Sequence, residues 1–170
     1  GDVYKRQRLH MERILPKMVR DGLAPPGGEP IDVGLLSPVP WAPVLDAALV
    51  HVGRWLDDGD PPPSQPLIEI EGDPPRIRRD GDGNALGGIR VPEMAAALSC
   101  NVGSLEESGA AGLFGTWSPL PAQTIKDRYP DRSKYLRAFE EAAQAAVRAG
   151  VLRPRDATEA IARASATDFG

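Results

Sequence analysis

The stretch Asp80-Gly81-Asp82-Gly83-Asn84-Ala85-Leu86-Gly87-Gly88-Ile89-Arg90-Val91-Pro92 separates a proline-rich first half of the chain from a second half with helical patterning. Its eight positions 81–88 hold four glycines, with Asp and Asn nearby, and these residue types favour tight turns and positive φ. Arg90 follows, where the turn gives way to an extended run. We therefore expect a shaped loop whose one cation, Arg90, either contacts an acidic substrate group or forms an ion pair with a loop aspartate.

The composition of the 170-residue chain excludes several classes of protein. Gly and Pro contribute 18 residues each and aromatic residues only 5%, so much of the chain is expected to be loop. The net charge is −4 and no cluster of Lys and Arg is present, which argues against a nucleic-acid partner. No apolar run approaches the roughly 18 residues that cross a bilayer, so no membrane span is expected. The single Cys100 indicates no internal disulfide and is read as a small buried hydrophobe.

Hydrophobic periodicity and capping residues predict the elements. An amphipathic helix is expected over 43–57, with His51 at the flank of its apolar face as a structural, partly buried histidine. Such a helix is marginal alone, so its apolar face must dock on another surface. The remaining expected elements are a hairpin of 67–71 with 76–79, an extended segment over 91–102, a polar loop over 103–112, a short helix opened by Ser118-Pro119 and ending at 128, a helix from the Asp131 cap to Gly150, and a helix from Pro154 to about 166.

Two acidic patterns are candidate sites. Asp80-x-Asp82-x-Asn84 resembles the start of a calcium loop, but the sixth and twelfth positions, which need Gly and Glu, hold Ala85 and Val91. A weak Ca²⁺ loop over 80–84 therefore stays only as part of an alternative function. Glu69 and Glu71 share one face of the expected strand, where a solvated surface is favoured over a catalytic dyad. The sequence predicts no zinc or other metal site and no cofactor, because its two histidines and one cysteine are widely spread.

The segment Gly83-Asn84-Ala85-Leu86-Gly87-Gly88-Ile89-Arg90-Val91-Pro92 resembles the G-N-A-L-G-G-I-R-x-P segment of a poorly characterised family of large α/β-hydrolase-domain proteins. Further similarity covers residues 47–64, with the string R-W-L-D-D-G-D-P-P-P-S, and residues 113–116 and 129–156. These stretches together extend over most of the chain. The resemblance therefore concerns the family as a whole and not one motif.

The resemblance implies an α/β fold class of which this chain is a C-terminal fragment, mostly helices and loops with a short β-hairpin and without most of the parallel sheet. Residues 1–7 resemble a sequencing-adapter translation artefact. Residues 8–60 would then end the hydrolase core, with the helix over 43–57 docked on the core sheet. Residues 61–118 would form a Pro/Gly-rich extension with short strands, and residues 119–168 a C-terminal helical subdomain.

The resemblance also implies a catalytic base. In the family a histidine followed within two residues by an acid ends the last strand of the sheet, and His10 with Glu12 is similar to that position. The sequence has no G-x-S-x-G motif, so the nucleophile and acid are expected upstream of His10. The expected function is ester or acyl-bond hydrolysis of a small molecule in the intact protein, in partnership with its missing N-terminal part, with this chain inactive alone. The alternative is a non-catalytic accessory or binding module.

Overall fold

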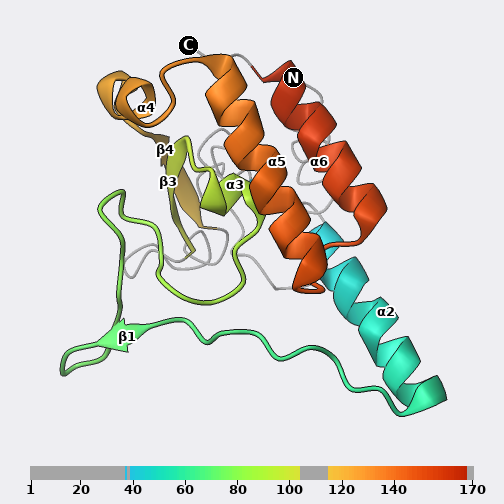
Figure 1. The fold of residues 1–170 in the computed structure, drawn as a ribbon. Coiled ribbons are helices and arrows are strands. Elements are labelled where there is room, and N and C mark those ends of the chain that lie inside the picture. The colour runs from blue at the N-terminus through green and yellow to red at the C-terminus, as the bar shows by residue number, and fades with distance from the viewer. Residues whose placement is uncertain (1–36, 38, 104–114, 168–170) are drawn as a thin grey trace, which may run out of the picture. The chain divides into compact units, whose positions relative to one another are not determined.

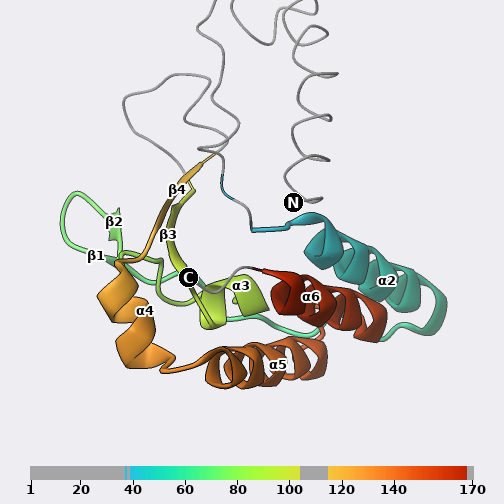
Figure 2. The same ribbon diagram turned by 90° about the horizontal axis from the view of Figure 1, so that it is seen from above.

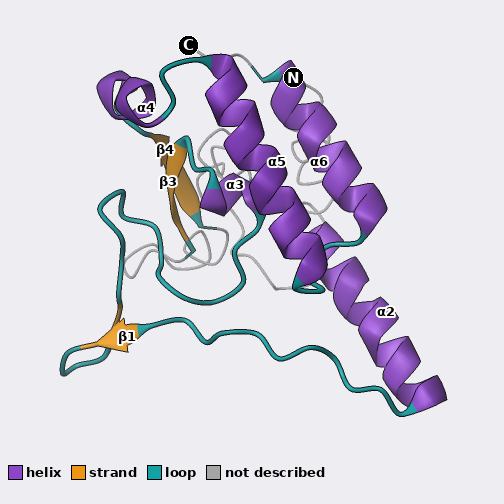
Figure 3. Cartoon of the chain, viewed as in Figure 1, coloured by secondary structure: helices purple, strands orange, loops and turns teal. Residues whose placement is uncertain are grey.

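The computed structural model describes residues 37, 39–103 and 115–167 (Figures 1 and 3). The chain divides into two compact units, residues 1–38 with 101–118 and residues 39–100 with 119–170. Within the described ranges, no helix combines the length and the hydropathy that a bilayer crossing requires. The described elements, in order, are α2 (Ala42–Asp58), β1 (Ile70–Glu71), β2 (Arg76–Ile77), α3 (Pro92–Ala95), β3 (Ser99–Val102), β4 (Thr116–Pro119), α4 (Ala122–Arg128), α5 (Arg132–Arg148) and α6 (Pro154–Ala166).

Helix α2 confirms the amphipathic helix expected over 43–57 to within one residue at each end. Pro43 lies in its first turn, where a missing backbone N–H costs nothing. Gly59 ends the helix in the left-handed region with φ 75°, and its N–H donates to the carbonyl of Trp55. Ala47 is the one residue of α2 that is buried. The helix therefore contacts the rest of its unit along a narrow strip.

Helices α5 and α6 form an antiparallel pair (Figures 1 and 2), and both agree with the sequence prediction. The carboxylate of Asp131 caps α5 by accepting the backbone N–H of Lys134 at 2.9 Å. Small alanines on α6, Ala160 and Ala164, allow the close approach of aromatic side chains. The buried cluster between the helices, α3 and α4 consists of Ala96, Tyr129, Tyr135, Phe139, Ala160 and Ala164.

The hairpin of β1 and β2 is antiparallel and pairs Ile70 with Ile77 and Glu71 with Arg76. It confirms the expected hairpin, although the regular strands are two residues each and shorter than predicted. The chain that follows pairs with both arms through isolated bridges, Ile68 with Gly87 and Arg79 with Ala85. The second half of the glycine-rich loop thus lies between the two arms of the hairpin.

The prediction of an extended segment over 91–102 is wrong in its first half. Pro92 stands in the first turn of α3 with Glu93 beside it, and both residue types stabilise a helix start. Only Ser99–Val102 is extended, as β3, and it pairs with β4. The loop expected over 103–112 lies outside the described residues except at Gly103.

The prediction that Ser118-Pro119 opens the next helix is also wrong. Both residues end β4, and α4 begins at Ala122 after Pro121 in the N-cap position. Two prolines two residues apart offer two possible helix starts. Because β4 pairs with β3, Thr116–Pro119 is extended, so the helix begins after the second proline, Pro121.

Arg153 ties α2 to the start of α6. Its guanidinium forms ion pairs with Asp46 of α2 and with Asp156 of α6, the latter at 2.5 Å. The side chain of His51, also on α2, lies with Nε2 2.9 Å from the carbonyl oxygen of Gly150, just after α5. His51 therefore has the structural role predicted for it. These contacts fix α2 along its inner side.

Asp156 is expected to make stability depend on pH. Its side chain is 8% exposed, and the hydrogen bond from Arg153 lowers the pKa of the carboxyl below its usual value of 3.8. A carboxyl with a lowered folded-state pKa stabilises the fold above the unfolded pKa and loses this contribution as pH falls through the folded value. We expect Asp156→Asn to lower the free energy of unfolding by about 2 kcal/mol at pH 6.

The lowered pKa of Asp156 also determines how Asp156→Asn changes the free energy of unfolding at low pH. The difference from the unmodified chain should shrink below about pH 4, because Asp156 is protonated first in the unfolded chain while the folded carboxyl, with its lowered pKa, stays ionised. Urea unfolding at pH 6 and pH 3 measures both values. A difference that stays constant over this range would contradict the assignment.

Candidate functional site

The first half of the glycine-rich loop is closed by the side chain of Asp80. Its Oδ1 accepts the backbone N–H groups of Asp82 at 3.0 Å and of Asn84 at 2.9 Å. The backbone N–H of Asp80 donates to the carbonyl of Asn84 at 2.8 Å. A short acidic side chain that binds the backbone two and four residues later is typical of Asx turns. Asp80 therefore has a turn-forming role.

Asn84 fixes this loop to the start of β3. It is fully buried, and its Nδ2 donates to the carbonyl of Ser99 at 3.0 Å. The adjacent Gly83 has φ 84°, and a Cβ built there would lie 2.8 Å from Sγ of Cys100. The thiol of Cys100 thus packs against loop backbone, although the residue is only half-buried and not the fully buried hydrophobe that was expected.

Arg90 binds the loop to α3. Its Nη1 donates to the carbonyl of Ala85 at 2.9 Å and its Nη2 to the carbonyl of Met94 at 3.1 Å. Nη2 also lies 3.5 Å from Oδ2 of Asp80. The ion pair with a loop aspartate, one of the two alternatives from the sequence, is therefore present. Contact of Arg90 with a substrate stays a prediction.

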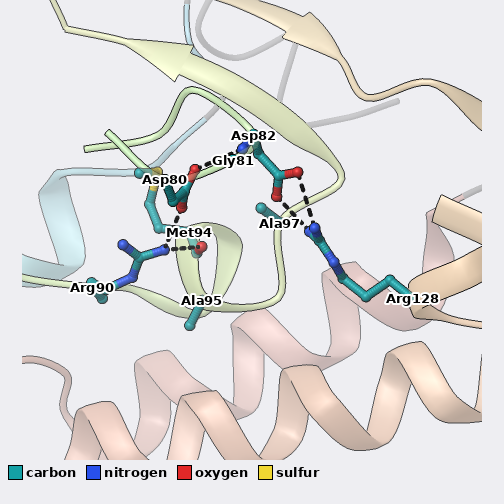
Figure 4. Close-up of a pocket in the computed structure, with 8 residues that line it drawn as sticks. All are labelled: Asp80, Gly81, Asp82, Arg90, Met94, Ala95, Ala97 and Arg128. Carbon is teal, nitrogen blue, oxygen red and sulfur yellow. Dashed lines mark hydrogen bonds and ion pairs between the residues drawn. The ribbon is translucent and has the colours of Figure 1, made fainter. Parts of the chain in front are cut away.

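A pocket of about 280 Å³ lies between this loop, α3 and α4 (Figure 4). The carboxylate of Asp82 binds Arg128 through two contacts, at 2.6 Å and 3.0 Å, and this hydrogen bonding raises the pKa of the guanidinium. The lining residues are Asp80, Gly81, Asp82, Arg90, Met94, Ala95, Ala97 and Arg128. Two carboxylates and two guanidiniums can orient a polar group. The lining residues include no serine, cysteine or histidine, and both carboxylates are paired with guanidinium groups.

The same contacts bear on the calcium alternative. Both oxygens of Asp82 face Arg128, and those of Asp80 face backbone N–H groups and Arg90. A bound cation would have to displace these donors. Across 39–103 and 115–167, no cluster of three His, Cys, Asp or Glu side chains could hold a metal ion. The geometry of the loop thus does not favour Ca²⁺.

Comparison with known proteins identifies the family. The model of the alpha/beta hydrolase domain matches residues 10–162, which is most of the chain. The chain belongs to the alpha/beta hydrolase domain family. No curated protein and no solved structure matched it in the corresponding searches. The resemblance carried by the glycine-rich stretch is therefore confirmed at the level of the hydrolase family.

Two sequence predictions for the hydrolase chain have different outcomes. His10, the candidate base, lies outside the described residues, so its role stays a prediction. Glu69 and Glu71 form ion pairs with Arg78, at 2.8 Å and 3.9 Å, on an exposed face. Their reading as a solvated surface pair agrees with these contacts.

Arg128 is the pocket residue that sequence reasoning missed. It stands at the end of α4, 46 positions after its partner Asp82. Nothing local in either segment signals this pairing, because it depends on how α4 packs beside the loop. A loop aspartate that is followed, later in the sequence, by a helix ending in a basic residue indicates such a pair only weakly.

Arg90→Lys is expected to destabilise the hydrolase chain although it keeps the charge. A lysine ammonium lacks the planar fork that reaches the carbonyls of Ala85 and Met94 from one position. We expect a loss of about 1–2 kcal/mol in the free energy of unfolding. Urea denaturation measures it, with the exposed Arg76→Lys as control. An effect no larger than that of the control would remove the bridging role.

Proposed function

We propose that this chain is part of an α/β-hydrolase-type enzyme that cleaves an ester or a related acyl bond of a small molecule. The observation that carries the proposal is the family match over residues 10–162. Within it, His10 is the proposed general base. The substrate and the nucleophile-bearing part of the enzyme are the proposed partners.

The order of catalytic residues supports a contribution from elsewhere in the protein. In α/β-hydrolases the nucleophile comes first, then the acid, then the histidine. The 170 residues contain no G-x-S-x-G elbow. We infer that the nucleophile and acid stand ahead of His10 in a longer protein, and that this chain alone is inactive. Residues 8–60 would complete the catalytic core, residues 61–118 would form the extension, and residues 119–168 the helical subdomain.

The proposed chemistry of His10 is proton transfer. Its imidazole would accept the hydroxyl proton of the nucleophile as that oxygen attacks the acyl carbon. The same proton would then pass to the leaving oxygen as the acyl bond breaks. Water would repeat the sequence to release the acyl group and restore the enzyme.

The test begins with the intact reading frame. We expect it to encode a G-x-S-x-G serine and a later acid, both ahead of His10, and the expressed protein to hydrolyse p-nitrophenyl esters. A fluorophosphonate probe should label that serine, while the 170-residue chain should show neither hydrolysis nor labelling. An intact frame without such a serine, or an intact protein that carries the serine but is neither labelled nor active, would overturn the proposal.

A further inference from the structure

Helix α3 forms one wall of the pocket beside the glycine-rich loop. Its residues Met94 and Ala95 line that pocket (Figure 4). The backbone N–H groups of both residues donate to the carbonyl of Val91, and the helix has only four residues. A single helical turn is not stable by itself. Contacts with other elements must therefore hold α3, and with it this wall of the pocket, in place.

Glu93 connects α3 to α5 and α6. Its side chain is 23% exposed, and its Oε1 lies 3.6 Å from Nη2 of Arg163 on α6. This distance is longer than the roughly 2.7–2.9 Å of a hydrogen bond between charged groups. Tyr135 of α5 is close enough for the charge of Glu93 to act on its hydroxyl. The carboxyl is thus largely removed from water, while its cationic partner stays at a distance.

The balance of burial and charge determines which form of Glu93 fits this position. Burial raises the pKa of Glu93 above its ordinary value of 4.5, and a hydrogen bond from its own backbone and the charge of Arg163 offset this only in part. Burial and, after it, the charge of Glu93 raise the pKa of Tyr135 to about 12, so this hydroxyl stays neutral while Glu93 titrates. The folded position therefore favours the protonated carboxyl.

The loop side of α3 carries a second charged pair. Arg90 donates to the carbonyl of Met94 and lies 3.5 Å from Asp80. This contact joins α3 to the glycine-rich loop, whereas Glu93 joins it to the helices. Movement of α3 away from α5 and α6 therefore also moves the pocket wall relative to the helices.

We propose that Glu93 makes the attachment of α3 depend on pH: α3 packs firmly against α5 and α6 while this carboxyl is protonated, and opens more often once it is charged. The carboxylate regains water when α3 opens, which favours the open form. Stability from Glu93 is fully present below pH 4.5 and is lost as the pH rises through the folded pKa. Asp156 has the opposite sign, because its carboxylate form stabilises the fold.

Hydrogen exchange of the Met94 and Ala95 amides measures this opening. After correction for the intrinsic pH dependence of exchange, opening in the 170-residue chain should be several-fold more frequent at pH 7 than at pH 4. Glu93→Gln, which is neutral at both pH values, should lose this increase. Glu159→Gln removes a carboxylate from an exposed position of α6 and should keep it.

Arg163→Gln separates a titrating group from a purely structural contact. Loss of the guanidinium removes a charge that favours the carboxylate, so the increase in opening between pH 4 and pH 7 should become larger. A structural contact alone would loosen α3 equally at both pH values. When Glu93→Gln is present in the same chain, Arg163→Gln should no longer change the pH dependence.

A carbon-13 NMR titration of the Glu93 carboxyl provides an independent check. We expect its midpoint above 4.5. A midpoint at or below this value would overturn the proposal. An increase in α3 opening that persists in Glu93→Gln, or that Glu159→Gln removes equally, would also overturn it.

Discussion

His10→Ala is expected to lower kcat/KM of the intact hydrolase by about four to six orders of magnitude. Without the imidazole, the nucleophile keeps its proton during attack and the leaving oxygen receives none. Groups that bind the substrate and stabilise the developing oxyanion would still act, so a small residual rate should remain. Steady-state kinetics with a p-nitrophenyl ester measures the loss.

The second histidine of the chain provides a control for His10→Ala. His51 stands on α2, and its Nε2 lies 2.9 Å from the carbonyl oxygen of Gly150, which is a structural contact. His51→Ala should therefore lower the melting temperature and leave kcat nearly unchanged. A loss for His10→Ala no larger than for His51→Ala would remove His10 from the catalytic residues.

Gly87→Ala is expected to lower the free energy of unfolding by about 3–5 kcal/mol. Gly87 has φ 69°, and an added Cβ would lie 2.2 Å from the carbonyl oxygen of Leu67 and 3.0 Å from the backbone nitrogen of Glu69. The Leu67 oxygen also accepts the N–H of Gly88 at 3.0 Å, so it cannot move freely. Relief of the contact would separate the loop from the hairpin.

Gly59→Ala is the matched control for Gly87→Ala. Gly59 has a similar φ of 75° but has no atom within 4 Å of an added Cβ. Gly59→Ala should lower the free energy of unfolding by only about 1–2 kcal/mol, which is the cost of placing an alanine in the left-handed backbone conformation. Chemical denaturation compares the two variants. Equal losses would mean that backbone conformation, and not the contact with Leu67, determines the effect.

The sequence predicted the elements whose signals are local. Helices α5 and α6 carry both a start signal, Asp131 or Pro154, and a regular apolar period within one segment. The hairpin was predicted because its alternating apolar pattern also lies within one short segment. Strand β4 and helix α3 were missed, because pairing with β3 and packing against α5 determine them, and no short window of sequence contains those partners.

The candidate site, too, was predicted only in the part that depends on local sequence. The glycine pattern predicted a turning loop, and one of the two alternatives for Arg90 was an ion pair with a loop aspartate, which is Asp80. The pocket itself could not be predicted, because Arg128 reaches Asp82 from a different element. His10 was proposed from family resemblance alone, since one histidine with a nearby acid has no distinctive local pattern.

The bridge made by Arg153 has a consequence for motion. The guanidinium of Arg153 binds Asp46 of α2 and Asp156 in the first turn of α6, so separation of α2 from α6 removes one of its two carboxylate partners. Backbone amides in α2 and at the start of α6 should therefore become accessible to solvent in a single cooperative opening. An arginine at the start of α6 thereby couples the opening of α2 to that of α6.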